Sequence, residues 1–402
     1  MQPSPLFRWA PLALGGAVLT ASCLGGQGAA NTKSPSQASG NSHTAVENSA
    51  PVVRTVVTST QIAGAGEPQV AVGTGKRVYV AFGAGDTLYA SLSTDGGSTY
   101  GAPVRVGTAG RLSLGMRRGP RIVATPKGAV ITAVYGKKGD GRDGELMSWQ
   151  SVDGGKTWLG PTVVNDVPGA AREGLHAMAV APDGTLACAW LDLREAGTQV
   201  FAAFSRDGGK TWGKNVRVYR SPAGNVCECC HPSLADGPDN RLHIILRNWL
   251  GGARDMYVSS TGDGGKSFSP ARKLGSGTWP LNACPMDGGA LAAAKGDVAT
   301  FWRRENTMYL AQTSGANTGE TKIGTGQQGW IAATERGTYL AWLRGRSGSP
   351  LLILTPNATT PLVIANSAQN PVVVAGPGPD PVVVTVWSDR QGIRSATLAM
   401  GD

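Results

Sequence analysis

Apolar residues in this chain come in short runs of Val, Ile, Ala and Leu that end at Gly, Pro, Asn or Asp. Such runs predict short, buried β-strands, and the spacing of apolar positions that marks an amphipathic helix is almost absent. Glycine accounts for 58 of the 402 residues, which indicates many tight turns, and 41% of the chain is hydrophobic. The pattern therefore predicts a large all-β fold.

One kind of strand recurs along the chain: an apolar run that ends in an aromatic or another large residue. A second apolar strand precedes each of these runs and a third follows it. In six units a fourth strand comes next, whereas the last unit stops at IRSATLAM. The seven runs are VYVAF (to Phe82), VITAVY (to Tyr135), LACAW (to Trp190), LHIIL (to Leu246), VATFW (to Trp302), TYLAW (to Trp342) and VVVTVW (to Trp387).

An eight-residue segment also repeats. SRDGGKTW, at residues 205–212, has near-copies in STDGGSTY, SVDGGKTW and TGDGGKSF. The third residue of each copy is an aspartate, and consecutive aspartates lie 54 to 58 positions apart. A period of about 50 residues in an all-β chain is typical of a propeller or a solenoid. The four aspartates are Asp95, Asp153, Asp207 and Asp263.

These repeats predict a seven-bladed β-propeller in which each unit forms one blade, numbered 1 to 7 along the chain. Six blades are the alternative if the short last units merge. The last blade lacks a strand, and VVRTVVTST at residues 52–60 can supply it, which closes the ring and removes open sheet edges. The octamers fall between third and fourth strands, where an Asp accepts turn N–H bonds and glycines allow positive φ. We therefore expect the four aspartates to be structural.

The chain begins like an exported protein. Residues 1–22 combine Arg8, an apolar stretch and small residues, as a signal peptide does. LTAS directly before Cys23 resembles the lipobox of bacterial lipoproteins, which implies that Cys23 is acylated; an ordinary cleavable signal is the alternative. Residues 23–50 have the composition of a flexible tether for a propeller of residues 51–402. We expect a lipid-anchored, extracytoplasmic protein of the bacterial cell envelope.

The formal net charge is +10. A basic exported protein attracts acidic glycans or phospholipid, although the same charge can serve solubility alone. The chain has no cluster of Lys and Arg with interleaved aromatic residues, so nucleic-acid binding is not expected. We expect a monomer that binds an acidic glycan or an extracytoplasmic protein.

The octamer resembles the Asp-box, S/T-x-D-x-G-x-[ST]-[WYF], of sialidases and of other propellers with BNR repeats. Blade 2, from GPRIVATPKG to SVDGGKTW, resembles the opening blade of sialidases. The resemblance implies that Arg121 is the first arginine of a triad that binds a substrate carboxylate, and that Asp143, or failing that Asp140, is the acid/base. A guanidinium can hold a carboxylate with two parallel hydrogen bonds, and a nearby Asp can protonate a glycosidic oxygen.

Blade 4, from ECCHPSLADG to TGDGGKSF, carries a second match. Its resemblance to the sialidase pattern implies Glu228 as the base that activates the nucleophile and Arg247 as the second arginine, with Arg303 or Arg304 of FWRREN as the third. Sialidases use a tyrosine nucleophile at the start of a later inner strand. That strand reads QQGWIAAT here, with Trp330, and no tyrosine has an obvious funnel position.

The cysteines divide by position. Cys188 lies in the strand LACAW, where a buried thiol is expected. Four others lie in loops of blades 4 and 5 at the mouth of the expected funnel, and in an exported protein they would form two disulfides with three possible pairings. These four are Cys227, Cys229, Cys230 and Cys284.

A metal site is the alternative for the same cysteines. In CECCH, three cysteines and His231 offer soft ligands, and Cys284 or His176 would complete a Cu(I) or Zn(II) shell. No other cofactor is expected.

Three functions therefore stay open. The first is a surface-tethered, sialidase-like protein that recognises an acidic glycan and hydrolyses terminal sialic-acid-type residues. The second is a non-catalytic propeller that binds a protein or polysaccharide, and the missing tyrosine favours it. The third is a metal-binding propeller built on the cysteine cluster.

Overall fold

The computed structural model describes residues 51–402 apart from 138–140, 295, 315–318 and 400–402. The expected signal peptide, Cys23, the tether to residue 50, and Asp140 lie outside the described residues. The described part of the chain forms 28 strands. No helix among these residues has the length and apolar character needed to cross a membrane.

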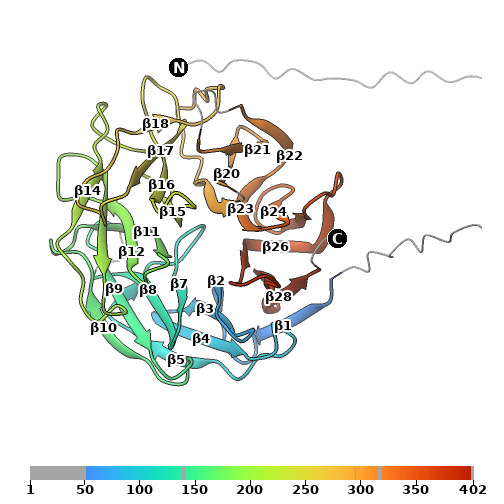
Figure 1. The fold of residues 1–402 in the computed structure, drawn as a ribbon. Helices are drawn as coiled ribbons and strands as arrows, with labels where there is room; N and C mark the ends of the chain where they lie inside the picture. Colours follow the sequence, from blue (N-terminus) through green and yellow to red (C-terminus); the bar gives the residue numbers. More distant parts are fainter. Residues whose placement is uncertain (1–50, 138–140, 295, 315–318, 400–402) are drawn as a thin grey trace, which may run out of the picture. The chain divides into compact units, whose positions relative to one another are not determined.

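Consecutive strands pair antiparallel, so that each hairpin adds to the sheet begun by the strand before it (Figure 1). Five sheets follow this rule and correspond to blades 1 to 5. In blade 2 a short extra strand, β6 (Arg111–Leu112), pairs with β8. The strands are β2 (Gly66–Val72), β3 (Val78–Ala84), β4 (Thr87–Ser93) and β5 (Val104–Gly107) in blade 1; β7 (Arg121–Thr125), β8 (Gly128–Gly136), β9 (Glu145–Ser151) and β10 (Leu159–Val163) in blade 2; β11 (Ala171–Val180), β12 (Leu186–Asp192), β13 (Gln199–Ser205) and β14 (Val216–Tyr219) in blade 3; β15 (Ser233–Asp236), β16 (Leu242–Arg247), β17 (Met256–Thr261) and β18 (Arg272–Lys273) in blade 4; and β19 (Ala290–Ala294), β20 (Asp297–Arg304), β21 (Thr307–Gln312) and β22 (Thr321–Thr325) in blade 5.

The sixth sheet has seven strands, because one long strand serves two blades. β26 pairs with β25 up to Ala368 and with β27 from Gln369 onward. Divided there, this sheet gives two groups of four strands, the second of which contains the N-terminal strand β1. The sheet runs β23 (Gln327–Thr334), β24 (Gly337–Leu343), β25 (Ser349–Leu354), β26 (Leu362–Ala375), β27 (Val383–Asp389), β28 (Gly392–Leu398) and β1 (Val53–Thr58).

The first strand of every blade faces a common axis. β2, β7, β11, β15, β19, β23 and the second half of β26 all line one central cavity of about 410 Å³. Figure 1 shows these inner strands around the centre and the later strands of each blade outside them. The expected all-β propeller is therefore confirmed, and loops far apart in the chain meet at the two ends of this axis.

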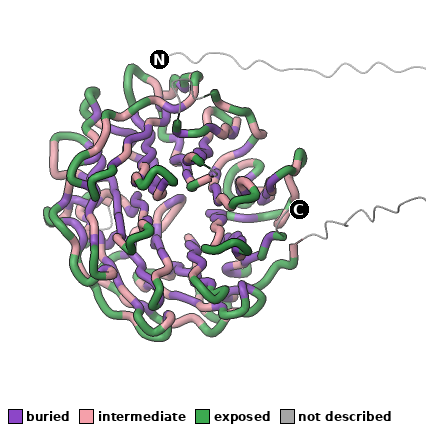
Figure 2. Tube along the Cα trace, in the orientation of Figure 1, coloured by how far each residue is buried: buried purple, intermediate pink, exposed green. Residues whose placement is uncertain are grey.

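The core lies between neighbouring blades. Buried residues follow the strands, whereas exposed residues gather in the loops of the outer rim (Figure 2). The large residue of each repeated run is buried, and Trp190 and Phe82 are fully so. Each buried aromatic removes about 150–250 Å² from water, which is worth about 4–6 kcal/mol before entropy costs. The repeated apolar run therefore fills the space between two sheets.

The repeated aspartates stand in hairpin turns that connect the third and fourth strands. Thr211 donates to Asp207 from its backbone N at 3.0 Å and from its hydroxyl at 2.6 Å, and the Ser205 hydroxyl donates at 2.8 Å. In the equivalent turn of blade 1, the hydrogen bond from the Thr99 hydroxyl holds the pKa of Asp95 well below its ordinary value. The same contacts recur at Asp153 and Asp263.

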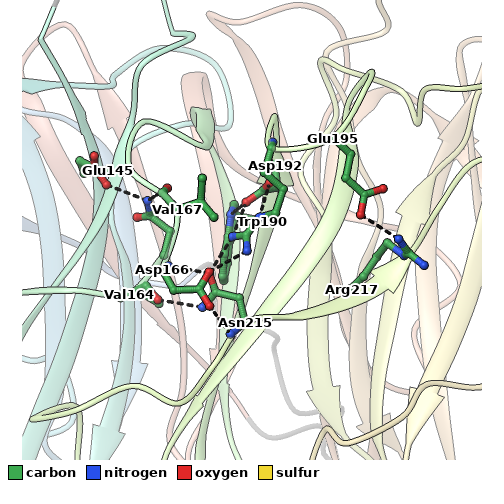
Figure 3. Close-up of polar contacts among 11 residues, drawn as sticks. Glu145, Val164, Asp166, Val167, Trp190, Asp192, Glu195, Asn215 and Arg217 are labelled. Carbon is green, nitrogen blue, oxygen red and sulfur yellow. Dashed lines mark hydrogen bonds and ion pairs between the residues drawn. The ribbon is translucent and has the colours of Figure 1, made fainter.

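A polar network ties blade 2 to blade 3 (Figure 3). Asp166 and Asn215 exchange two hydrogen bonds, of 2.7 and 3.0 Å, between backbone nitrogens and side-chain oxygens. Arg194 donates to both of these side chains. Because Asp166 belongs to the loop that leads into β11, the network fixes the start of that inner strand.

The cation of this network is balanced by a buried carboxylate. Asp192 is fully buried and accepts hydrogen bonds from Trp190 Nε1 at 2.7 Å and from Arg194 Nε at 2.8 Å. A second ion pair of blade 3, Glu195 with Arg217, lies nearby on the surface, and its side chains are 25% and 46% exposed. Blade 3 therefore contains one ion pair with a buried carboxylate, Arg194 with Asp192, and one exposed ion pair, Arg217 with Glu195.

Replacing Arg194 with Ala is expected to destabilise the fold by about 3–5 kcal/mol, because the buried charge of Asp192 loses its cation. The matched variant Arg217→Ala is expected to cost at most about 1 kcal/mol, since its partner is hydrated. Urea unfolding followed by tryptophan fluorescence measures both losses. Equal losses in the two variants would contradict the role assigned to Asp192.

Candidate functional site

The loops that lead into the inner strands surround one end of the central cavity, here called the mouth. Near the start of six inner strands a residue other than glycine adopts a left-handed backbone, which costs about 1–3 kcal/mol each. The pairing register also shifts at the start of β2, β11, β23 and the inner half of β26. Strain repeated at one place in the ring makes the mouth the candidate functional region. The residues are Glu67 (φ 48°), Arg117 (62°), Glu173 (52°), Met286 (54°), Gln328 (57°) and Asn370 (49°).

Side chains from distant parts of the chain meet here. Asn370 Nδ2 lies 3.5 Å from Glu67 Oε1, and the Asn370 backbone N donates to Gln328 Oε1 at 3.2 Å. Arg117 donates to the carbonyls of Gly329 and Pro371, both at 3.2 Å. Blades 1, 2, 6 and 7 are thus joined around the mouth.

Blades 2, 3 and 4 contribute a chain of ion pairs. Glu173 accepts from Arg118 and lies 3.1 Å from Arg172 Nη2. Arg172 also donates to the carbonyl of Glu228 at 3.1 Å, and its Nη2 lies 3.8 Å from the Glu228 carboxylate. The Thr198 hydroxyl donates to the other Glu228 oxygen at 3.1 Å. Carboxylates and guanidiniums therefore alternate along this side of the mouth.

Glu67 and Glu173 lie in opposite environments on either side of Arg118. Burial raises the pKa of Glu67 above its ordinary value, although the Gly115 N–H and the Arg118 cation act in the other direction. Glu173 instead contacts two guanidiniums, which compensate its charge. A carboxyl with a raised pKa beside one that contacts two guanidiniums is an arrangement that acid/base chemistry can use.

Two of the arginines expected to bind a substrate carboxylate, Arg121 and Arg247, are buried. Arg121 is 4% exposed and donates to the carbonyls of Pro120 at 2.8 Å and Arg117 at 2.9 Å. Arg247 is 2% exposed and donates to three carbonyls, those of Asp287, Arg254 and Arg303. Burial and the nearby Arg117 lower the pKa of Arg121 to about 9. Neither residue presents a free guanidinium to a substrate carboxylate, as the sequence resemblance implied, because backbone carbonyls already accept hydrogen bonds from both of its Nη atoms.

The two candidates for the third arginine point to different places. Arg303 Nε lies 3.0 Å from the buried Asp287 carboxylate, so this residue stays at the mouth beside Arg247. Arg304 pairs with Glu320 and lies over the Tyr309 ring at 4.0 Å. Arg304 therefore belongs to the packing of blade 5 rather than to a triad.

The expected acid/base pair is only partly assembled. Asp143 accepts from the backbone N of Lys137 at 3.0 Å in the loop between β8 and β9. That loop packs on the mouth, since the Gly141 carbonyl accepts from the Glu173 N–H at 3.0 Å. Glu228 joins the chain of ion pairs and is 44% exposed. Sequence reasoning missed Glu67 and Glu173, although each directly precedes a Pro or Gly in its loop, a repeated pattern that could have identified them.

The position where sialidases have a tyrosine lies in the cavity wall and is occupied by Trp330. Its ring stacks on His231 at 5.9 Å, and the Arg117 guanidinium lies 5.2 Å from its centre. Burial and the surrounding arginines push the pKa of the enclosed His231 well below its ordinary value. Neither Tyr257 nor Tyr309 is among the described residues that line this cavity, and the same holds for Tyr339.

The cysteines of the mouth are free thiols. All five described cysteines are reduced, so the two expected disulfides are not formed in this structure. Cys227 Sγ lies 3.7 Å from Cys229 Sγ and 3.3 Å from Cys230 Sγ, and the exposed Cys284 contacts Cys229. Hydrogen bonds from the two other thiols, with help from nearby arginines, lower the pKa of Cys227. Burial raises the pKa of the separate Cys188 to about 12.

Neither histidine joins these sulfurs. The described ligand atoms that lie within 4.8 Å of one another here are the sulfurs of Cys227, Cys229 and Cys230, so His231 is outside the group. His176 uses both ring nitrogens in blades 2 and 3, at 3.0 Å from the Gly174 carbonyl and 3.1 Å from the Thr132 hydroxyl. The imidazole ligands of the expected metal shell are therefore not in place.

A family model described as BNR repeat-like domain matches residues 83–298, more than half of the chain. No curated protein matches the chain significantly.

Solved structures share the fold. An α-L-arabinanase of Penicillium chrysogenum is similar with a TM-score of 0.53 and 13% identity, over 86% of this chain and 98% of that one. An α-L-arabinofuranosidase of Fusarium graminearum gives 0.52 and 12%, over 83% and 92%. A Hadza microbial sialidase gives 0.51 and 15%, over 84% and 66%. At these identities the likeness concerns the fold alone.

Replacing Glu67 with Gln is expected to stabilise the protein at pH 8 and to change little at pH 4. The raised pKa means that the folded state resists ionisation, so wild type loses stability as the pH rises above the unfolded value near ~4.3. Thermal melts of both proteins across this range measure the difference. A stability difference independent of pH would contradict the raised pKa of Glu67. Glu173→Gln, which breaks ion pairs, should instead destabilise the protein at pH 8.

Proposed function

Because the chain belongs to the BNR repeat-like family, we propose that its mouth binds an acidic glycan and cleaves a glycosidic bond. The observation that carries this proposal is the pair of carboxyls beside Arg118. Burial raises the pKa of Glu67, whereas Glu173 is held in ion pairs.

In the proposed reaction, Glu67 gives its proton to the glycosidic oxygen as the bond to the anomeric carbon breaks. Glu173 faces the positive charge that develops on the sugar and takes the proton of the attacking water. Arg118 and Arg172 hold the Glu173 carboxylate in place. The exposed Glu228, bound to the same Arg172, is a second carboxylate that can contact the sugar.

The charge of the mouth supports an acidic substrate. Arg118 and Arg172 are partly exposed, with 18% and 11% of their side chains accessible, whereas Arg117, Arg121 and Arg247 are buried. Solvent and salt screen buried charges poorly, so these three arginines add to the positive field. The carboxylate of a terminal sialic acid or of a uronic acid would be attracted by this positive charge. The sialidase that shares this fold supports sialic acid by analogy.

A specific observation favours a second candidate, a propeller that binds the glycan without cleaving it. Trp330 stands in the cavity wall, where a flat indole can stack on a sugar ring but cannot act as a nucleophile. In this second function the same arginines bind the same acidic glycan, but Glu67 transfers no proton.

The proposal includes a location. An acylated Cys23 and the segment to residue 50 would hold a monomeric propeller at the outer side of a bacterial membrane, where its mouth meets extracellular polysaccharide or protein.

Full-length protein is to be assayed with fluorogenic sialosides, uronides and arabinofuranosides. Glu67→Gln and Glu173→Gln are each expected to lower kcat by about 10²–10⁴-fold, since each removes one partner of proton transfer. Glu195→Gln, in the exposed ion pair of blade 3, is the matched control and should keep the wild-type rate. The wild-type rate should fall as the pH rises through the raised pKa of Glu67.

Two outcomes decide between the candidates. Unchanged rates in Glu67→Gln and Glu173→Gln would reject their assigned roles. Calorimetric binding of a sialylated or uronic-acid oligosaccharide with no turnover of any substrate would favour the non-catalytic propeller.

A further inference from the structure

The loop between β14 and β15 gathers three sulfurs on one side of a turn. The Cys230 N–H donates to the Cys227 carbonyl at 3.3 Å, and the Cys227 N–H donates to the Arg247 carbonyl at 2.9 Å. The first bond closes the turn, and the second fixes it to the end of β16. As a result the sulfurs of Cys227, Cys229 and Cys230 all lie within 4.8 Å of one another, and all three residues are buried.

The separations of these sulfurs suit a shared metal ion better than a covalent bond. A metal–sulfur bond of about 2.3 Å places two sulfurs about 3.8 Å apart in tetrahedral and about 4.0 Å apart in trigonal geometry. Cys227 Sγ lies 3.7 Å from Cys229 Sγ and 3.3 Å from Cys230 Sγ. A disulfide would require about 2.05 Å. Only a small outward movement of Cys230 would place three sulfurs around one ion.

The surroundings supply positive charge for thiolates. Arg254 Nη1 donates to Cys227 Sγ at 3.1 Å, and its guanidinium is fixed by the Leu281 carbonyl and the Trp249 ring. Arg247 is a second buried cation beside Cys227. Three thiolates and one monovalent cation carry a net charge of −2, which these two arginines balance. Such partners around the ligands tune a metal site and hold its ligands in place.

The remaining neighbours select a soft ion. Met286, in the left-handed region at φ 54°, packs against the cluster of these three cysteines, and its thioether is a ligand type that Cu(I) accepts. The imidazole that a zinc shell would draw on is absent from the group, because His231 lies outside it and stacks on Trp330. Cys284 is exposed and touches Cys229, so it stands at the entrance rather than inside.

We propose that Cys227, Cys229 and Cys230 bind one Cu(I) ion as a three-coordinate thiolate site, with the Met286 thioether against it and Cys284 at its entrance. The site lies in blade 4, beside the carboxylates of the mouth. Its existence does not depend on whether the mouth cleaves a glycan.

Full-length protein, reduced under anaerobic conditions, is to be titrated with Cu(I) in competition with bathocuproine disulfonate. Wild type is expected to retain one equivalent of copper, with ultraviolet bands of sulfur-to-copper charge transfer. Cys227→Ser, Cys229→Ser and Cys230→Ser should each lower the retained copper at least tenfold. Cys188→Ser, which removes a buried thiol of blade 3, is the matched control and should retain one equivalent, as should Cys284→Ser.

X-ray absorption of copper-loaded wild type is independent of any variant and is expected to give three sulfur ligands. A shell of nitrogen and oxygen ligands would overturn the proposal. So would equal copper retention in Cys227→Ser and wild type, or preferential binding of Zn(II) that requires Cys284. A disulfide among the three cysteines that persists through reduction and copper loading would also overturn it.

Discussion

Pairing of β1 with β28 closes the ring, and the arrangement of every other part depends on that closure. β28 would otherwise expose an unpaired edge, and the seven inner strands would not be held around one axis. Closure brings Asn370 against Glu67 and places Arg117 on the carbonyls of Gly329 and Pro371. The mouth is thus built from residues about 300 positions apart in the chain, and no single blade contains it.

The arginines of the mouth form two groups that differ in burial. Three arginines are buried and donate hydrogen bonds to backbone carbonyls, which holds the loops that precede the inner strands. They are Arg117, Arg121 and Arg247. The partly exposed arginines, Arg118 and Arg172, are left to pair with carboxylates. The buried arginines fix the loop geometry and contribute positive charge, while the partly exposed arginines face the ligand in the proposed function. Because backbone carbonyls satisfy the buried guanidiniums, these arginines can lie close together although each does not have a carboxylate of its own.

The fold could be read from the sequence because its signals are local. An Asp-box turn is complete within eight residues, as the contacts of Asp207 with Ser205 and Thr211 demonstrate, and the apolar runs reveal the strands directly. The candidate site could be predicted only in part from the sequence. Whether Arg121 faces a ligand or a carbonyl depends on the register and on a left-handed backbone nearby, and neither is visible in the residue pattern. The choice between disulfides and a metal site at Cys227 likewise depends on distances that spacing does not determine.

β26 has a consequence for how this ring can fail. Because one continuous strand belongs to blades 6 and 7, peeling either blade away exposes hydrogen bonds of the other. Elsewhere adjacent blades share no strand and are joined by loops, side-chain packing and isolated hydrogen bonds, such as the one from the Ala171 N–H to the Gly144 carbonyl between blades 3 and 2. We therefore expect two other neighbouring blades to separate before blades 6 and 7 do.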